Sequence, residues 1–189
     1  MKEEVLSFWF GAPSDPGFGQ PRREWFQRDA AFDDEIRNRF GALHEAVIAG
    51  AHESWLLSAR SALAYVIVLD QFSRNLFRDH ARAFAQDAQA RRGADQAILR
   101  GLDREVTHLE RSFFYLPFMH SENLADQDRA IALYEALAEG DEKSSNLDYA
   151  RRHRAIIERF GRFPHRNRVM GRESTPEEIE FLAQPGSGV

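Results

Sequence analysis

Hydrophobic residues recur at helical spacing along most of the chain. The clearest stripe follows Asp29, with apolar residues three or four positions apart at Phe32, Ile36, Phe40, Leu43 and Val47. This spacing places the five side chains on one face of an α-helix. Because Asp29 can cap the first turn and Gly50 can end the last one, the pattern predicts an amphipathic helix between them.

Similar patterns predict further helices along the chain. We expect them at 2–10, from Ser58 through the apolar stretch ALAYVIVL, from Asp87 as N-cap to about Arg100, at 106–116, at 123–138, at 147–160 and after Thr175. The stripe of the 147–160 helix comprises Tyr149, His153, Ile156 and Phe160. Pro117 is expected to end the 106–116 helix, and the polar run DEKSSN after Gly140 to form a loop. Thr175, Pro176 and Glu178 match a capping box.

ALAYVIVL is apolar on all sides, which predicts a central helix packed by neighbours all round. Its β-branched residues would also suit a buried strand, but no second strand candidate exists to pair with it. The chain is therefore predicted to be all-α, with seven or eight helices in antiparallel pairs. With 189 residues and no long linker, it is expected to form one domain, 1–189, with a disordered tail at 184–189.

Composition and charge indicate which cellular compartment and which classes of partner to expect. No apolar run is long enough to span a bilayer, and the N-terminus MKEEVLSFWF is acidic and unlike a signal peptide. These features predict a cytoplasmic protein without a membrane partner. The absence of cysteine excludes thiol chemistry. A net charge of −5 argues against nucleic acid as a partner, although residues 151–172 hold eight Arg and one Glu.

Three polar segments interrupt the apolar pattern where it predicts core, and local rules fail most often at functional sites. The first is DQFSRN, 70–75, directly after the most hydrophobic helix. If the helix continues, Asp70, Arg74 and Arg78 form one ladder of residues four apart. The ladder is either an internal ion-pair network that ends a buried helix, or a rigid Arg presented to an anionic ligand.

The second segment is YLPFMHSEN, 115–123, in which His120, Ser121 and Glu122 follow an aromatic run. In a turn, a His-x-Glu pair is suited to proton transfer or metal ligation. The alternative is a capping role for Ser121 beside a hydrogen-bonded His120.

The third segment is RFGRFPHRNRVMGR, 159–172, after the helix that carries His153 in its apolar stripe. A single His on an apolar face is usually a hydrogen-bonded core residue. In the loop that follows, apolar anchors alternate with polar side chains, as in the lining of an anion pocket. The anchors are Phe160, Phe163 and Pro164, and the polar residues are Arg159, Arg162, His165, Arg166 and Asn167.

These segments also carry a family resemblance. LDQFSRNLFR, RSFFYLPFMHSE with Gln127 following, HRAIIERFGRFPHRN, GR and STPEE resemble the uncharacterised bacterial family known as domain of unknown function 924. The resemblance extends from FWFG to the final FL. It implies an all-α, tetratricopeptide-like superhelical array, and it implies no activity.

The first hypothesis for function is a small-molecule site, in a binding protein or an enzyme, lined by Arg, His and Asp and selective for an anionic ligand. The candidate catalytic residues are His120, Glu122, His153 and His165, with a His as general base. The candidate ligand-binding residues are Asp70, Arg74, Asn75, Arg162, Arg166 and Asn167. No cofactor and no metal are predicted, and the three segments are expected to converge on one cavity.

The second hypothesis is a helical-repeat-like protein-protein interaction module whose concave face binds a protein partner. A third interpretation makes all three segments buried networks that specify helix packing. The sequence carries no signal for substrate or oligomeric state.

Overall fold

The computed structural model describes residues 1–137 and 141–188, with the backbone alone at 141–144, and Val189 lies outside it. Throughout these ranges the regular elements are helices, which confirms the all-α prediction. The chain forms two compact units, Met1–Arg78 with Arg82–Pro117, and Asp79–Ala81 with Phe118–Val189. The single-domain prediction stays a prediction.

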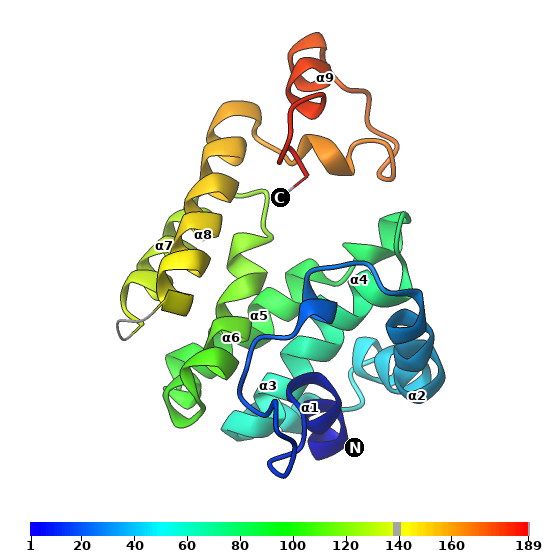
Figure 1. Cartoon of the computed structure of the whole chain (residues 1–189), viewed down its shortest axis with the longest axis vertical. Coiled ribbons are helices and arrows are strands. Elements are labelled where there is room, and N and C mark those ends of the chain that lie inside the picture. Colours follow the sequence, from blue (N-terminus) through cyan, green and yellow to red (C-terminus); the bar gives the residue numbers. More distant parts are fainter. Residues whose placement is uncertain (138–140, 189) are drawn as a thin grey trace. The chain divides into compact units, whose positions relative to one another are not determined.

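The first unit contains α1 (Lys2–Phe10), α2 (Ala30–Ile48), α3 (Ala59–Ile67), α4 (Ser73–Leu76), α5 (Asp87–Leu99) and the start of α6 (His108–Met119) (Figure 1). The second contains the end of α6, α7 (Leu124–Glu135), α8 (Asp141–Phe160) and α9 (Pro176–Leu182). Short 3-10 turns lie at Arg23–Trp25, Glu53–Leu57 (η2), Ala81–Ala83, Leu102–Glu105 and Pro164–Arg166 (η6). Residues 184–188 form a bend and turns after α9.

An aromatic cluster forms the core of the first unit. Trp9 of α1 is fully buried, and its ring lies 5.7 Å from Phe72 and 5.9 Å from Phe113. Trp25 stacks on Trp9 at 5.9 Å and donates a 3.0 Å hydrogen bond to the Trp9 carbonyl. Arg22 donates to the Phe8 carbonyl at 2.6 Å. The loop after α1 therefore returns to satisfy the carbonyls at the end of that helix.

Helix starts follow the predicted caps in two places. Asp29 accepts the Phe32 N–H at 3.0 Å at the start of α2, and Thr175 with Glu178 forms the capping box of α9. Asp87 does not cap α5: the N-cap residue is Gln86, and the Asp87 carboxylate binds Arg74 instead. An ion pair with a partly buried Arg is the stronger interaction for that carboxylate.

Pro117 lies inside α6, although it was expected to end the helix. A proline inside a helix costs about 3 kcal/mol. Continuing the helix buries Phe118 and Met119, which are 1% and 4% exposed. Burial of two such side chains contributes about 1.5–3 kcal/mol each, enough to offset the proline.

The predicted DEKSSN loop is also wrong, because α8 begins at Asp141. In α8, His153 and Ile156 are buried as the stripe requires, whereas Tyr149 is 49% exposed. The helix therefore extends to Tyr149 and beyond it without burying that part of the predicted stripe, a case that periodicity alone misses.

Helices α3 and α5 cross closely at Gly93. A Cβ added there would lie 2.9 Å from Cε1 of the buried Tyr65 ring, whereas one added at Gly41 in α2 would meet no atom within 4 Å. Gly93→Ala should lower the free energy of unfolding by about 1 kcal/mol or more, because overpacking exceeds the gain in helix propensity. Gly41→Ala should raise it by up to about 1 kcal/mol. Urea unfolding followed by circular dichroism compares them, and stabilisation by both would contradict the close crossing.

Candidate functional site

The DQFSRN segment lies in one continuous helix formed by α3, a π-helical turn at Val68–Phe72 (η3) and α4. Asp70, 1% exposed, lies 3.3 Å from the Arg74 guanidinium and accepts a 2.6 Å hydrogen bond from Gln71. Arg74 also donates to both carboxylate oxygens of Asp87, at 3.0 and 3.2 Å. One guanidinium thus neutralises part of the charge of two buried carboxylates, as buried charge requires.

Arg78 does not extend the ladder from Asp70 and Arg74. It forms a bidentate pair with Asp33 of α2, and Asn75 donates to the same carboxylate at 2.8 Å. The helix ends at Leu76, and the non-helical backbone of Phe77 places Arg78 beyond it, so the spacing of four residues no longer aligns Arg78 with Asp70 and Arg74. Asn75 and Arg78 therefore join this helix to α2.

Ser73 connects the π turn to a buried histidine. Its hydroxyl donates to the Leu69 carbonyl at 2.6 Å and lies 2.8 Å from His44 Nε2. Because the hydroxyl proton is used on Leu69, His44 Nε2 must be the donor in this pair. Burial lowers the pKa of His44, which favours the neutral ring.

In the second unit, the end of α8 positions the third polar segment. Gly161, with a positive φ of 67°, lets the chain reverse after Phe160. Phe163 is then fully buried, and Pro164 starts η6 in its fixed backbone conformation. The sequence GRFPHR therefore buries one ring and immediately turns His165 and Arg166 around it.

Glu122 and Arg172 hold the backbone of Phe163 from both sides. Glu122 accepts the Phe163 N–H at 2.8 Å and pairs with both terminal nitrogens of Arg172, at 2.7 and 2.9 Å. Arg172 donates in turn to the Phe163 carbonyl at 3.1 Å. Burial alone would raise the pKa of Glu122, but the bonds from Arg172 and Phe163 outweigh it and lower that pKa. We call this arrangement the Phe163 clamp.

The MHSEN turn is fixed by hydrogen bonds at its ends. Gln127, fully buried, donates to the carbonyls of Met119 and Ser121 at 2.7 and 2.6 Å. Asn123, rather than Ser121, caps α7 by accepting the Ala125 N–H at 2.8 Å. The Ser121 hydroxyl accepts the Asn123 N–H and donates to Asp126. The turn directs Glu122 to the Phe163 clamp and His120 to His153.

Arg162 and Asn167 meet at the capping-box acid of α9. Glu178, 2% exposed, accepts two bonds from Arg162, at 2.7 and 2.8 Å, and one from Asn167 at 3.2 Å. The bond from Arg162, aided by those from the Thr175 N–H and Asn167, lowers the pKa of Glu178 to about 2. Arg162 and Asn167, both predicted to bind a ligand, instead connect α9 to the loop after α8 through their hydrogen bonds to Glu178.

Three more predicted residues of this unit surround the Phe163 ring, and a fourth lies beside one of them. His153 meets the ring edge-on at 5.5 Å, His165 lies 5.6 Å from it, and the Arg166 guanidinium lies over it at 4.4 Å. His120 lies 6.4 Å from His153. We call these four residues and Phe163 the Phe163 cluster. It places four groups able to carry positive charge next to one another.

The protonation state of His153 follows from its surroundings. Burial lowers its pKa to about 3, and the positive potentials of His120, Arg166 and His165 act in the same direction. Its Nδ1 lies 2.8 Å from the Tyr149 carbonyl, which can only accept, so the proton sits on Nδ1. At neutral pH, Nε2 is therefore an unprotonated acceptor.

Sequence reasoning missed Arg172 and Glu178 as members of these networks. Arg172 carried no signal beyond a GR pair, because its partner Glu122 is 50 residues away in the chain. Glu178 had a local signal in the capping box, but not its additional role as the partner of Arg162.

Two kinds of feature are absent from the described part of the chain. There, no group of three or more His, Asp and Glu residues is arranged to hold a metal ion. Within the same residues, no helix combines the length and the apolar character needed to cross a bilayer.

These features define an all-α protein in which three histidines and one arginine gather at a buried phenylalanine. Residues 5–186 match the family of bacterial proteins of unknown function that is also called domain of unknown function 924, and the chain belongs to this family. It is also similar to the solved structure of a protein of unknown function from Agrobacterium tumefaciens, with 43% identity, 96% of each chain covered and a TM-score of 0.84. No curated protein matches the chain.

The Phe163 clamp should make a larger contribution to stability than an exposed ion pair of the same unit. Glu122→Ala leaves Arg172 and the Phe163 N–H without their acceptor and should cost about 2 kcal/mol. Glu135→Ala, which breaks an exposed pair with Arg151, should change stability by less than about 0.5 kcal/mol. Urea unfolding followed by circular dichroism measures both variants. Equal effects would argue against the clamp.

His153 should make folding sensitive to mild acid. Its pKa is lower in the folded state than the ordinary 6.5, so the unfolded chain binds its proton first and stability falls as pH drops below about 6.5. The loss should approach about 1.4 kcal/mol per pH unit between about pH 6 and 4.

His153→Gln keeps a donor for the Tyr149 carbonyl and removes the titrating group. Urea unfolding at pH 7, 6 and 5 should show a shallower pH dependence for the variant, by about one proton. This window precedes the protonation of most carboxylates. Parallel profiles for the two proteins would show that His153 titrates alike in both states.

Proposed function

We propose that the second unit binds a small oxyanion at the Phe163 cluster. The observation that carries this proposal is the convergence of His153, His165 and Arg166 around one buried ring, with His120 beside His153. Burial is the largest cause of the low pKa of His153, and repulsion from His120, Arg166 and His165 adds to it. A bound anion would relieve the repulsion, because it lowers the potential that the cationic groups share.

The neutral His153 adds a second requirement on the ligand. Its Nε2 has no hydrogen-bond partner within the described residues, and at neutral pH it can only accept a proton or a hydrogen bond. The ligand that fits carries an anionic oxygen together with an O–H group. Inorganic phosphate, a phosphate monoester and a hydroxycarboxylate all meet this requirement.

Binding is favoured over acid-base catalysis as the primary role. A general base works best with a pKa near the operating pH, and a histidine with a pKa of about 3 is a weak base at pH 7. The catalytic roles of His120, Glu122, His153 and His165 stay predictions. So does the single cavity formed with Asp70, Arg74 and Asn75.

The helix arrangement is proposed to be tetratricopeptide-like. Support comes from the α7–α8 pair, in which Asp128 binds Arg154 and Glu135 binds Arg151. Later residues of α7 thus meet earlier residues of α8, so the two helices are antiparallel, as Figure 1 also shows. A hairpin of this kind is the building block of helical repeats.

Calorimetric titration with phosphate and with citrate tests the proposal. Arg166→Gln should weaken binding at least about tenfold, because a charge-assisted hydrogen bond contributes about 1.5–3 kcal/mol. The matched control is Arg152→Gln, which removes one positive charge from the exposed surface of α8 and should change affinity less than about twofold.

His165→Gln provides a second variant if circular dichroism shows that Arg166→Gln does not fold. The expected result for it is the same loss of affinity. The proposal is overturned if neither anion binds saturably to the wild-type protein, or if the cluster variants bind as tightly as Arg152→Gln.

A further inference from the structure

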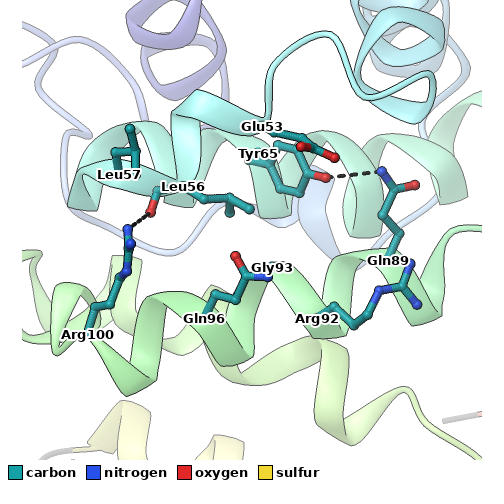
Figure 2. Close-up of a pocket in the computed structure, with 9 residues that line it drawn as sticks. All are labelled: Glu53, Leu56, Leu57, Tyr65, Gln89, Arg92, Gly93, Gln96 and Arg100. Atoms are coloured by element: carbon teal, nitrogen blue, oxygen red, sulfur yellow. Dashed lines mark hydrogen bonds between the residues drawn. The ribbon is translucent and has the colours of Figure 1, made fainter.

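A cleft in the first unit lies between η2 and α5 and has a volume of about 270 Å³ (Figure 2). One wall carries Glu53, Leu56 and Leu57 of η2, and the other carries Arg92, Gln96 and Arg100. Pockets for drug-sized ligands measure about 300–1,000 Å³, so this cleft suits a smaller molecule. None of its residues belongs to the three polar segments or to the Phe163 cluster.

The floor of the cleft is built by the close crossing of α3 and α5. Gly93 lacks a side chain at the point where a Cβ would meet the Tyr65 ring, so the α5 backbone and this ring pack closely at the floor. Gln89 uses its amide nitrogen on Tyr65 Oη at 3.0 Å and on the Val47 carbonyl at 3.3 Å. Tyr65 accepts that bond, and its own O–H has no acceptor among the described residues. The floor thus presents a donor on a fixed ring.

The walls carry opposite charges that do not pair. Glu53 and Arg92 line the cleft from opposite sides, and neither side chain makes an ion pair or a hydrogen bond within the described part of the chain (Figure 2). Arg100 stands eight residues after Arg92, about 12 Å further along the helix axis. It is oriented by a 3.2 Å bond to the Leu56 carbonyl and keeps further N–H donors.

We propose that this cleft binds an α-amino acid with an acidic side chain. Glu53 would accept the ammonium group, Arg92 the α-carboxylate and Arg100 the side-chain carboxylate, with the carbon chain over Leu56. The two Arg and one Glu give the lining a net charge of +1. An acidic amino acid carries −1 and balances it, whereas a neutral amino acid leaves one guanidinium without a partner.

The ammonium contact distinguishes this ligand from a plain dicarboxylate. A dicarboxylate would leave Glu53 facing an anion, and like charges brought together reduce affinity. The cleft should therefore select for the amino group as well as for both carboxylates.

Calorimetric titration of the full chain with L-glutamate, L-glutamine and glutarate tests the proposal. L-Glutamate should bind at least about tenfold more tightly than the other two, since each lacks one charged contact. Arg92→Gln should weaken glutamate binding at least about tenfold. Arg23→Gln, which removes an exposed positive charge from the same unit away from the cleft, should leave it unchanged.

Two further variants assign the contacts. Glu53→Gln should abolish the preference for glutamate over glutarate, and Arg100→Gln the preference for glutamate over glutamine. The three cleft side chains are exposed, and circular dichroism checks that each variant folds. His165→Gln should not affect glutamate binding, so failure here and failure of oxyanion binding at the Phe163 cluster are separate results.

Three outcomes would overturn the proposal. One is the absence of saturable binding of L-glutamate. Another is equal affinity for all three compounds. The third is an effect of Arg92→Gln no larger than that of Arg23→Gln.

Discussion

The arrangement of the second unit depends on the ion pair between Glu122 and Arg172. Each partner also bonds the backbone of Phe163, one at its N–H and the other at its carbonyl. A buried peptide group needs such partners. The following turn supplies one for the Phe163 carbonyl, from the Arg166 N–H at 3.1 Å, whereas the Phe163 N–H is bound by the Glu122 side chain. The clamp therefore allows a non-helical segment to bury a complete phenylalanine ring.

The position of Phe163 restricts where the residues next to it can lie. Pro164 starts a tight turn, and His165 and Arg166 follow it around the ring. His153 comes from the preceding helix and meets the same ring. His153, His165 and Arg166 are thus held next to one another by their contacts with one hydrophobic side chain.

In the first unit, the buried charged side chains form ion pairs with one another. Asp70, Arg74 and Asp87 pair among themselves, and Asp33 pairs with Arg78. Two of these pairs connect different helices, Arg74 with Asp87 of α5 and Arg78 with Asp33 of α2, so they compensate buried charge and join the helices. The cleft between η2 and α5 shows the opposite pattern, because Glu53 and Arg92 are exposed on facing walls and form no ion pair with any described residue.

The sequence alone determined the helical class and much of the helix placement, because periodicity and capping act over a few neighbouring residues. Asp29, Thr175 and Glu178 cap helices as their local patterns predict. The tertiary structure decided the rest. Asp87 forms an ion pair with Arg74 and does not cap α5. Pro117 lies inside α6 because the residues that follow it are buried. Glu122 and Arg172, 50 residues apart, find each other only in the folded chain, and no local pattern encodes a contact of that range.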